Sequence, residues 1–152
     1  MASTEIERIA DQLERAFEGN AWHGPPVMEV LRGIGANEAS ARLFPGTHTV
    51  REIVAHIAAW KRIVARRIAG EVVRPTSAQD WPAPKGSWSS AVSELRRAHR
   101  DLVKAMRKLP AARLRATVPG KDHNFYVSLH GMVQHDLYHA GQIALLKKAL
   151  RS

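Results

Sequence analysis

The stretch of sequence that organises the chain is His135-Asp136-Leu137-Tyr138-His139-Ala140-Gly141-Gln142. It lies within residues 128–150, whose apolar spacing predicts one amphipathic helix. Two histidines four residues apart on a helix lie about one turn apart and point the same way. His135 and His139, followed one turn later by Gln142, therefore place polar side chains in an otherwise apolar stripe. The two rings are spaced to hold one metal ion between them.

Three further long helices are predicted outside this stretch. They span about residues 4–17, 49–69 and 87–109. The first two begin at capping boxes, Thr4-x-x-Glu7 and Thr49-x-x-Glu52, and the third stops at Pro110. Because no segment alternates cleanly as a strand would, the sequence predicts an all-α protein, a four-helix bundle that forms one domain over its whole length, residues 1–152.

The connections between these helices are too long for a simple up-down-up-down bundle. The first contains Pro25-Pro26, which can start a short helix, and those at 71–86 and 111–125 are irregular. Crossovers of this length permit two sequential helices to run parallel. Trp81 and Trp88 bracket the connection at 71–86, and we expect at least one of them to anchor it on the bundle.

The composition excludes several classes of protein and site. The chain has no cysteine, which excludes disulfides, thiolate metal sites and a cysteine nucleophile and fits a reducing compartment. No apolar run approaches the roughly 20 residues that span a bilayer. The segment Met1-Ala2-Ser3-Thr4-Glu5 lacks the basic and apolar regions of a signal peptide. We therefore expect a cytoplasmic protein without a membrane partner.

The net charge of +9 is concentrated in residues 51–152. A basic surface can attract nucleic acid or small anions. The basic residues are spread over three helices, however, and few aromatic residues lie between them. We interpret them as solvated helix faces, with Lys61 and Arg67 on the exposed side of their helix, and do not expect nucleic acid as a partner.

A third histidine, His56, borders the apolar stripe of the helix predicted at 49–69. An unpaired polar group in a core costs a few kcal/mol, so several such groups need a partner. Three imidazoles from two facing helices suit a divalent metal site with open coordination positions. Histidines at this spacing also occur as hydrogen-bonded core side chains, and the residues alone leave both interpretations open.

Two segments and a shorter third one carry a family resemblance. They are Val54-Ala55-His56-Ile57-Ala58-Ala59-Trp60, Gln134-His135-Asp136-Leu137-Tyr138-His139-Ala140-Gly141-Gln142-Ile143 and Ala21-Trp22-His23-Gly24-Pro25. Together they resemble the DinB/YfiT-like superfamily of bacterial metal-binding four-helix bundles. The resemblance implies up-down-down-up topology, a homodimer, and a divalent metal held by His56, His135 and His139, with water or substrate completing the shell. Imidazole serves zinc, nickel, iron and manganese, so the ion stays open.

The resemblance also implies a range of activities. Some members are metal-dependent transferases that join a low-molecular-weight bacterial thiol to an electrophile, or isomerases that use such a thiol, and the metal holds that thiol as a thiolate. The hypothesis is therefore a metal-dependent enzyme of the thiol S-transferase or hydrolase type, acting on a small molecule, with a thiol as a second cofactor. The alternative is a non-catalytic metal-binding protein, for example a sensor or a stress-response interaction partner.

Two residues are candidates for catalytic roles beside the metal. His23 lies in the long first connection, where it can fold over the site as a fourth ligand or proton shuttle, or serve only a local turn. Gln142 can hydrogen-bond a ligand histidine or a metal-bound water, or simply pack in a helix interface.

Other polar and aromatic residues receive structural interpretations. Asp136 and Tyr138 point off the histidine face, and we expect Asp136 at the surface. Trp22 and Trp60 can wall an apolar pocket, although core packing is the default for Trp60. His99 lies on the stripe of the helix predicted at 87–109 and is not expected to be a ligand.

Overall fold

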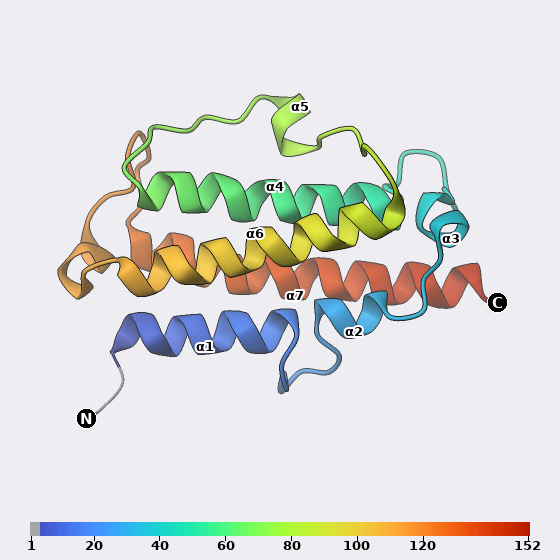
Figure 1. Ribbon diagram of the computed structural model, residues 1–152, viewed down its shortest axis with the longest axis horizontal. Coiled ribbons are helices and arrows are strands. Elements are labelled where there is room, and N and C mark those ends of the chain that lie inside the picture. The colour runs from blue at the N-terminus through green and yellow to red at the C-terminus, as the bar shows by residue number, and fades with distance from the viewer. Residues whose placement is uncertain (1–3) are drawn as a thin grey trace.

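The protein is built from helices (Figure 1). A computed structural model describes residues 4–152, and within them seven α-helices, one 3-10 helix and no strand are formed. They are α1 (Glu5–Phe17), α2 (Val27–Leu31), α3 (Ala36–Ser40), α4 (Val50–Ile68), α5 (Ser77–Asp80), α6 (Trp88–Lys108), η1 (Ala111–Arg115) and α7 (Phe125–Leu150). The predicted all-α class is confirmed. The expectation that the chain lacks a signal peptide rests on residues 1–5. Residues 1–3 of that segment lie outside the part of the chain that the structure describes.

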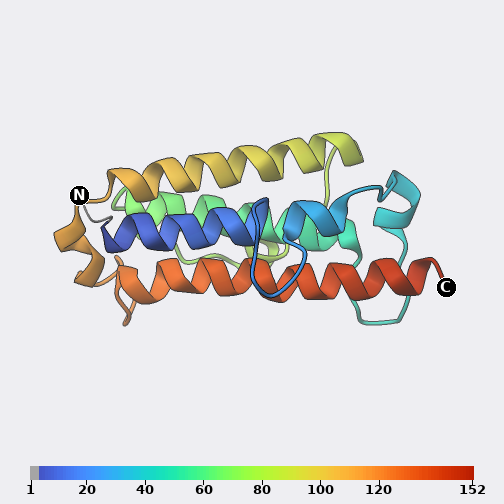
Figure 2. The same cartoon turned by 90° about the horizontal axis from the view of Figure 1, so that it is seen from below.

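The long helices form a bundle with two parallel neighbours (Figures 1 and 2). In Figure 1, α1 and its continuation α2 run from left to right, α4 and α6 both run from right to left, and α7 returns from left to right. The segment that joins α4 to α6 passes over the outside of α4 and carries α5. These directions follow the up-down-down-up order that the long connections permit.

Local sequence signals set where the helices begin. At α4 the Thr49 hydroxyl accepts from the Glu52 amide at 3.1 Å, and the Glu52 carboxylate accepts from the Thr49 amide at 2.7 Å. The capping box predicted at Thr4 also forms. The last helix begins earlier than the predicted residue 128, because the Asn124 side chain caps it by accepting from the Val127 amide at 3.0 Å. This adds one turn to the start of α7.

A polar layer divides the apolar core in two. On α4, α6 and α7 alike, one apolar cluster ends and the other begins around the middle of the helix. Between the two clusters lie Lys61 of α4, His99 of α6, and Asp136 and His139 of α7, all of them buried. Buried polar groups require partners, so this layer is where the fold has to be explained by specific contacts.

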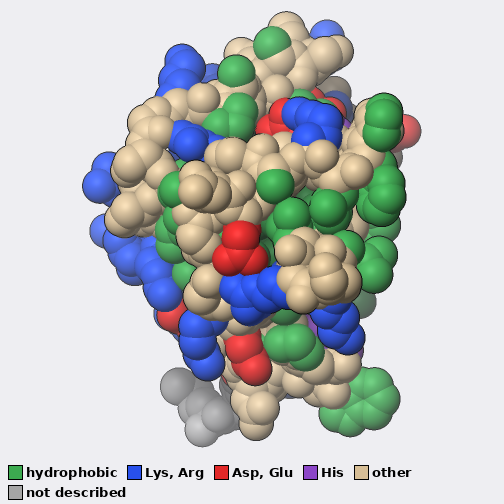
Figure 3. Space-filling model, turned by 90° about the vertical axis from the view of Figure 1, so that its right-hand side faces the viewer, with side chains coloured by type: hydrophobic (Ala, Val, Ile, Leu, Met, Phe, Trp, Pro, Cys, Tyr) green, Lys and Arg blue, Asp and Glu red, His purple; other side chains and the backbone are tan. Residues whose placement is uncertain are grey.

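The basic side chains are distributed over the surface. On the end of the molecule shown in Figure 3, Lys and Arg side chains are most numerous along the left edge and apolar ones along the right, with acidic side chains between them. Several are paired with acidic side chains of other elements, as in Arg62–Glu94, Arg66–Glu71 and Arg107–Glu14. None of the helices within residues 4–152 has the length and apolar character needed to cross a membrane.

Candidate metal centre

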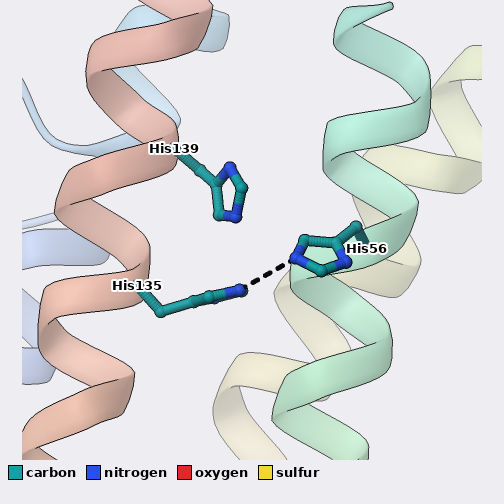
Figure 4. Close-up of side chains that lie close together, drawn as sticks. All are labelled: His56, His135 and His139. Carbon is teal, nitrogen blue, oxygen red and sulfur yellow. Dashed lines mark hydrogen bonds between the residues drawn. The ribbon is translucent and has the colours of Figure 1, made fainter. Parts of the chain in front are cut away.

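Three histidines meet between α4 and α7 at the level of the polar layer (Figure 4). His56 comes from α4, and His135 and His139 come from successive turns of α7. One imidazole nitrogen of each ring lies within 4.8 Å of those of the other two, and the Nε2 atoms of His56 and His135 are 3.0 Å apart. His56 and His139 are buried and His135 is half-buried.

Neighbouring oxygen atoms hold two of these rings in a defined tautomer. His56 Nδ1 lies 2.6 Å from the carbonyl oxygen of Asp80, and His139 Nδ1 lies 2.7 Å from Oε1 of Gln142. An oxygen of this kind only accepts, so each Nδ1 carries the hydrogen and donates it. The Nε2 atom of each neutral ring is then bare and available as a ligand, which is the usual arrangement of a metal-bound histidine.

The geometry fits a divalent cation. Nitrogen ligands about 2.1 Å from one ion lie roughly 3.0–3.4 Å apart in octahedral or tetrahedral geometry. The His56–His135 separation of 3.0 Å has this value, and a nitrogen of His139 lies within 4.8 Å of both rings' ligand atoms. The chemistry of the rings also fits a cation. His135 Nδ1 is buried without a hydrogen-bond partner. Without a cation, the facing Nε2 atoms of His56 and His135 have to share one hydrogen.

Burial keeps the three rings neutral at physiological pH. Loss of solvation, reinforced by the neighbouring basic groups, lowers the pKa of His135 to about 3. Burial likewise lowers the pKa of His139 to about 4 and lowers the pKa of His56. A metal binds the neutral form of imidazole, so no proton has to be displaced from these rings near pH 7.

The segment between α4 and α6 covers the cluster from outside. The Trp81 indole stacks on the His56 ring, with centroids 3.8 Å apart and planes 9° from parallel. His48 stacks on Trp81 in turn, and Asp80 Oδ1 accepts from Trp60 Nε1 at 2.7 Å. Trp81 therefore anchors the connection, as expected for one of the two bracketing tryptophans. The sequence predicted that a tryptophan anchors this connection, but not that Trp81 stacks on His56. A Pro-rich connection carries no local signal of which residues it will cover.

A comparison with protein families agrees with the resemblance noted in the sequence. The family model described as the DinB superfamily matches residues 25–143. The chain belongs to the DinB superfamily. The matched range runs from before α2 into α7 and includes all three histidines. No curated protein and no solved structure matches the chain.

This DinB-superfamily chain also buries an ion pair directly beside the histidines. Lys61 Nζ lies 2.6 Å from Asp136 Oδ2, and both side chains have 0 % of their area exposed. The same ammonium lies 3.3 Å from His99 Nδ1 and 4.9 Å from the centroid of the Phe17 ring. Burial lowers the pKa of Lys61 and raises that of Asp136, and their mutual contact opposes both shifts.

The predictions of an exposed Lys61 and a surface Asp136 are therefore wrong. Asp136 lies off the apolar stripe that contains the two histidines, and the sequence of one helix does not show whether a second side of it is also covered. In the structure α7 contacts both α1 and α4, so that two of its sides are covered. Arg67, also expected to be exposed, is buried and donates to the Val73 carbonyl at 2.9 Å.

The remaining candidates lie in different surroundings. Gln142 contacts the cluster through His139, as described above. His23 is exposed in the loop between α1 and α2, and the structure does not bring it into the cluster. Trp22 is fully exposed, so the prediction that it walls a pocket is wrong, whereas the half-buried Trp60 lies 6.2 Å from His135 between ring centroids. Tyr138 is exposed, off the histidine face as expected.

Proposed function

We propose that the protein binds one divalent metal ion through His56, His135 and His139 and uses it as a metal-dependent enzyme of the thiol S-transferase or hydrolase type. The observation that carries the proposal is that three neutral imidazoles converge. Oxygen atoms hold the Nδ1 hydrogens of His56 and His139. Membership of the DinB superfamily supports it independently.

The chain's own residues would prepare the site in three ways. The Asp80 carbonyl and the Gln142 side chain orient the His56 and His139 rings, so that the Nε2 lone pairs face inward. Trp81 excludes water from the face of His56 on which it stacks. A divalent ion bound there would supply Lewis acidity, which makes a water molecule or a thiol reactive at neutral pH.

An open metal site favours catalysis over a purely structural role. Structural zinc sites are closed by four protein ligands, whereas catalytic sites have three and leave a position for water or substrate. Within residues 4–152, no fourth His, Cys, Asp or Glu joins the three histidines. A coordination position would therefore remain for a substrate or thiol. The alternative function, a non-catalytic metal-binding protein such as a stress-response interaction partner, requires the same ion but no turnover.

The metal content of the purified protein tests the binding step. Plasma mass spectrometry should find about one zinc, nickel, iron or manganese ion per chain. His135→Ala and His139→Ala should each lose it, while His23→Ala, which removes an exposed histidine away from the cluster, should keep it. Metal-free protein from metal-replete medium would refute the proposal, and loss of the ion in His23→Ala would show that this residue is a fourth ligand.

The activity of the metal-loaded protein tests the catalytic step. An electrophile should be consumed in a metal-dependent way with one member of a panel of low-molecular-weight bacterial thiols, or an ester or amide should be hydrolysed without a thiol. A protein that holds its ion but turns over none of these would favour the non-catalytic alternative. A homodimer and a cytoplasmic location stay predictions, and sedimentation of the metal-loaded chain tests the first of them.

A further inference from the structure

A pocket opens beside the three histidines on the side towards the start of α7. It has a volume of about 350 Å³ and lies between the second half of α4, the first turns of α7 and the loop that joins η1 to α7. His135 belongs both to the lining of this pocket and to the histidine cluster. The pocket therefore adjoins the candidate metal centre and shares His135 with it.

The walls of the pocket are mostly apolar. Trp60 and Val64 line it from α4, and Val127 and Met132 line it from α7. Gly131 also lines it, one turn before His135, and a Cβ placed on Gly131 would meet no heavy atom within 4 Å. The missing side chain at this position leaves space in the pocket. An apolar body such as a ring or a short alkyl chain would gain burial there.

The polar part of the lining is cationic. Arg67 and Lys121 supply the positive charge, Ser128 and His123 are the other polar residues on this side, and no Asp or Glu among the described residues lines the pocket. Arg67 is held in place by its hydrogen bonds to the Val73 carbonyl and lies over the Trp60 ring, 5.6 Å from its centroid. Lys121 is half-buried, and its ammonium makes no ion pair within residues 4–152. An unpaired cation at an apolar pocket favours an anionic ligand.

We propose that this pocket binds a small organic anion, with its apolar body against Trp60 and Met132 and its carboxylate or phosphate group beside Lys121. The inference rests on the proposed function in one respect: if His135 holds a metal ion, this anion is the class of substrate or thiol cofactor that reaches it. The charge complementarity and the open space at Gly131 do not depend on the metal.

Binding of three matched probes to the metal-free protein tests the inference. The probes are 4-phenylbutyrate, its uncharged amide and 4-phenylbutylamine, which share an apolar body and differ in charge. Titration calorimetry should rank the anion first and the amine last. Lys121→Gln should weaken binding of 4-phenylbutyrate by about twofold to fivefold, the size expected for a partly exposed ionic contact, and leave the amide nearly unaffected.

Two glycines of α7 provide a matched pair for the pocket itself. Gly131→Leu places a side chain in the pocket and should abolish binding of all three probes. Gly141→Leu introduces the same residue on the same helix, also where a Cβ meets no atom within 4 Å, but outside the pocket lining, and should bind as the unaltered protein does. Equal binding of the anion and the amine, or equal loss in the two leucine variants, would overturn the inference.

Metal content of the same purified proteins, measured before the metal is removed for the binding assays, separates this inference from the proposed function. Anion-selective binding by a protein that takes up no metal would leave the pocket in place and refute the metal centre. A protein that binds metal through the three histidines but shows no preference for the anion would refute the pocket as an anion site and leave the metal centre standing.

Discussion

Two polar clusters lie at the same level of the bundle and are satisfied in different ways. His56, His135 and His139 form one cluster between α4 and α7, and Lys61 and Asp136 form the other between the same two helices, with His99 of α6 beside them. His135 and Asp136 are neighbours in the chain, so one helix supplies both clusters. The ion pair contains both charges and is closed to solvent, whereas the histidine cluster contains three groups of a single kind.

The difference shows how to separate a structural polar cluster from a site. The opposite charges of Lys61 and Asp136 neutralise each other within the chain, although Asp136 Oδ1 is buried without a hydrogen-bond partner. Three neutral imidazoles converge, the Nε2 atoms of His56 and His135 face each other with one hydrogen between them, and the cluster contains no cation of its own. We therefore assign the ion pair to the fold and the histidines to chemistry, and each of the three predictions below tests one side of this assignment.

The largest expected effect is on the ion pair. Lys61→Met leaves the Asp136 carboxyl buried without its partner, and should lower the free energy of unfolding by about 3–5 kcal/mol. The double variant Lys61→Met/Asp136→Leu removes both buried polar groups and should recover most of that loss. Urea denaturation of the metal-free proteins measures both. A double variant no more stable than the single one would show that the pair is not a self-contained unit.

A smaller effect is expected at the histidine cluster. Gln142→Ala removes the acceptor that holds the His139 ring, and should weaken metal affinity by about tenfold to a hundredfold. The free energy of unfolding of the metal-free protein should change little. Gln134→Ala, at an exposed position of the same helix, is the control and should leave the affinity as it is. Competition with a chelating dye gives the affinities, and equal values for the two variants would remove Gln142 from the site.

The smallest effect concerns pH and His99. Burial, with the Lys61 charge beside it, lowers the pKa of His99 to about 3, from an ordinary value of 6.5. The unfolded chain therefore binds a proton at this residue below pH 6.5 that the folded chain refuses down to about pH 3. Stability present above pH 6.5 is lost as the pH falls through this window.

Between pH 7.5 and 5.5 the loss amounts to about 1.4 kcal/mol for one such histidine. In the metal-free protein His135 and His139 add losses of the same sign. His99→Leu should therefore make the fall in stability between these pH values shallower by about 1.4 kcal/mol without abolishing it. Urea denaturation at the two pH values measures this. An unchanged slope would mean that His99 accepts its proton in the folded chain.

Much of the fold could be predicted because its signals are local. The capping boxes at Thr4 and Thr49 lie within four residues of sequence and form as predicted. The convergence of His56 with His135 followed from their positions on apolar stripes and from the DinB-like motif. Their role as metal ligands stays a prediction, and so does that of His23, which the structure leaves exposed and outside the cluster.

The sequence by itself determined the helices, their caps and the histidine spacing, because these depend on residues within a turn or two of one another. Only the tertiary structure decided what Lys61 and Asp136 do, since their contact joins positions 75 residues apart. The same holds for Trp81, which reaches His56 only after the crossover has folded back over α4. Burial is a property of how distant segments pack, and a charged residue that is closed on all sides looks in sequence like one that faces water.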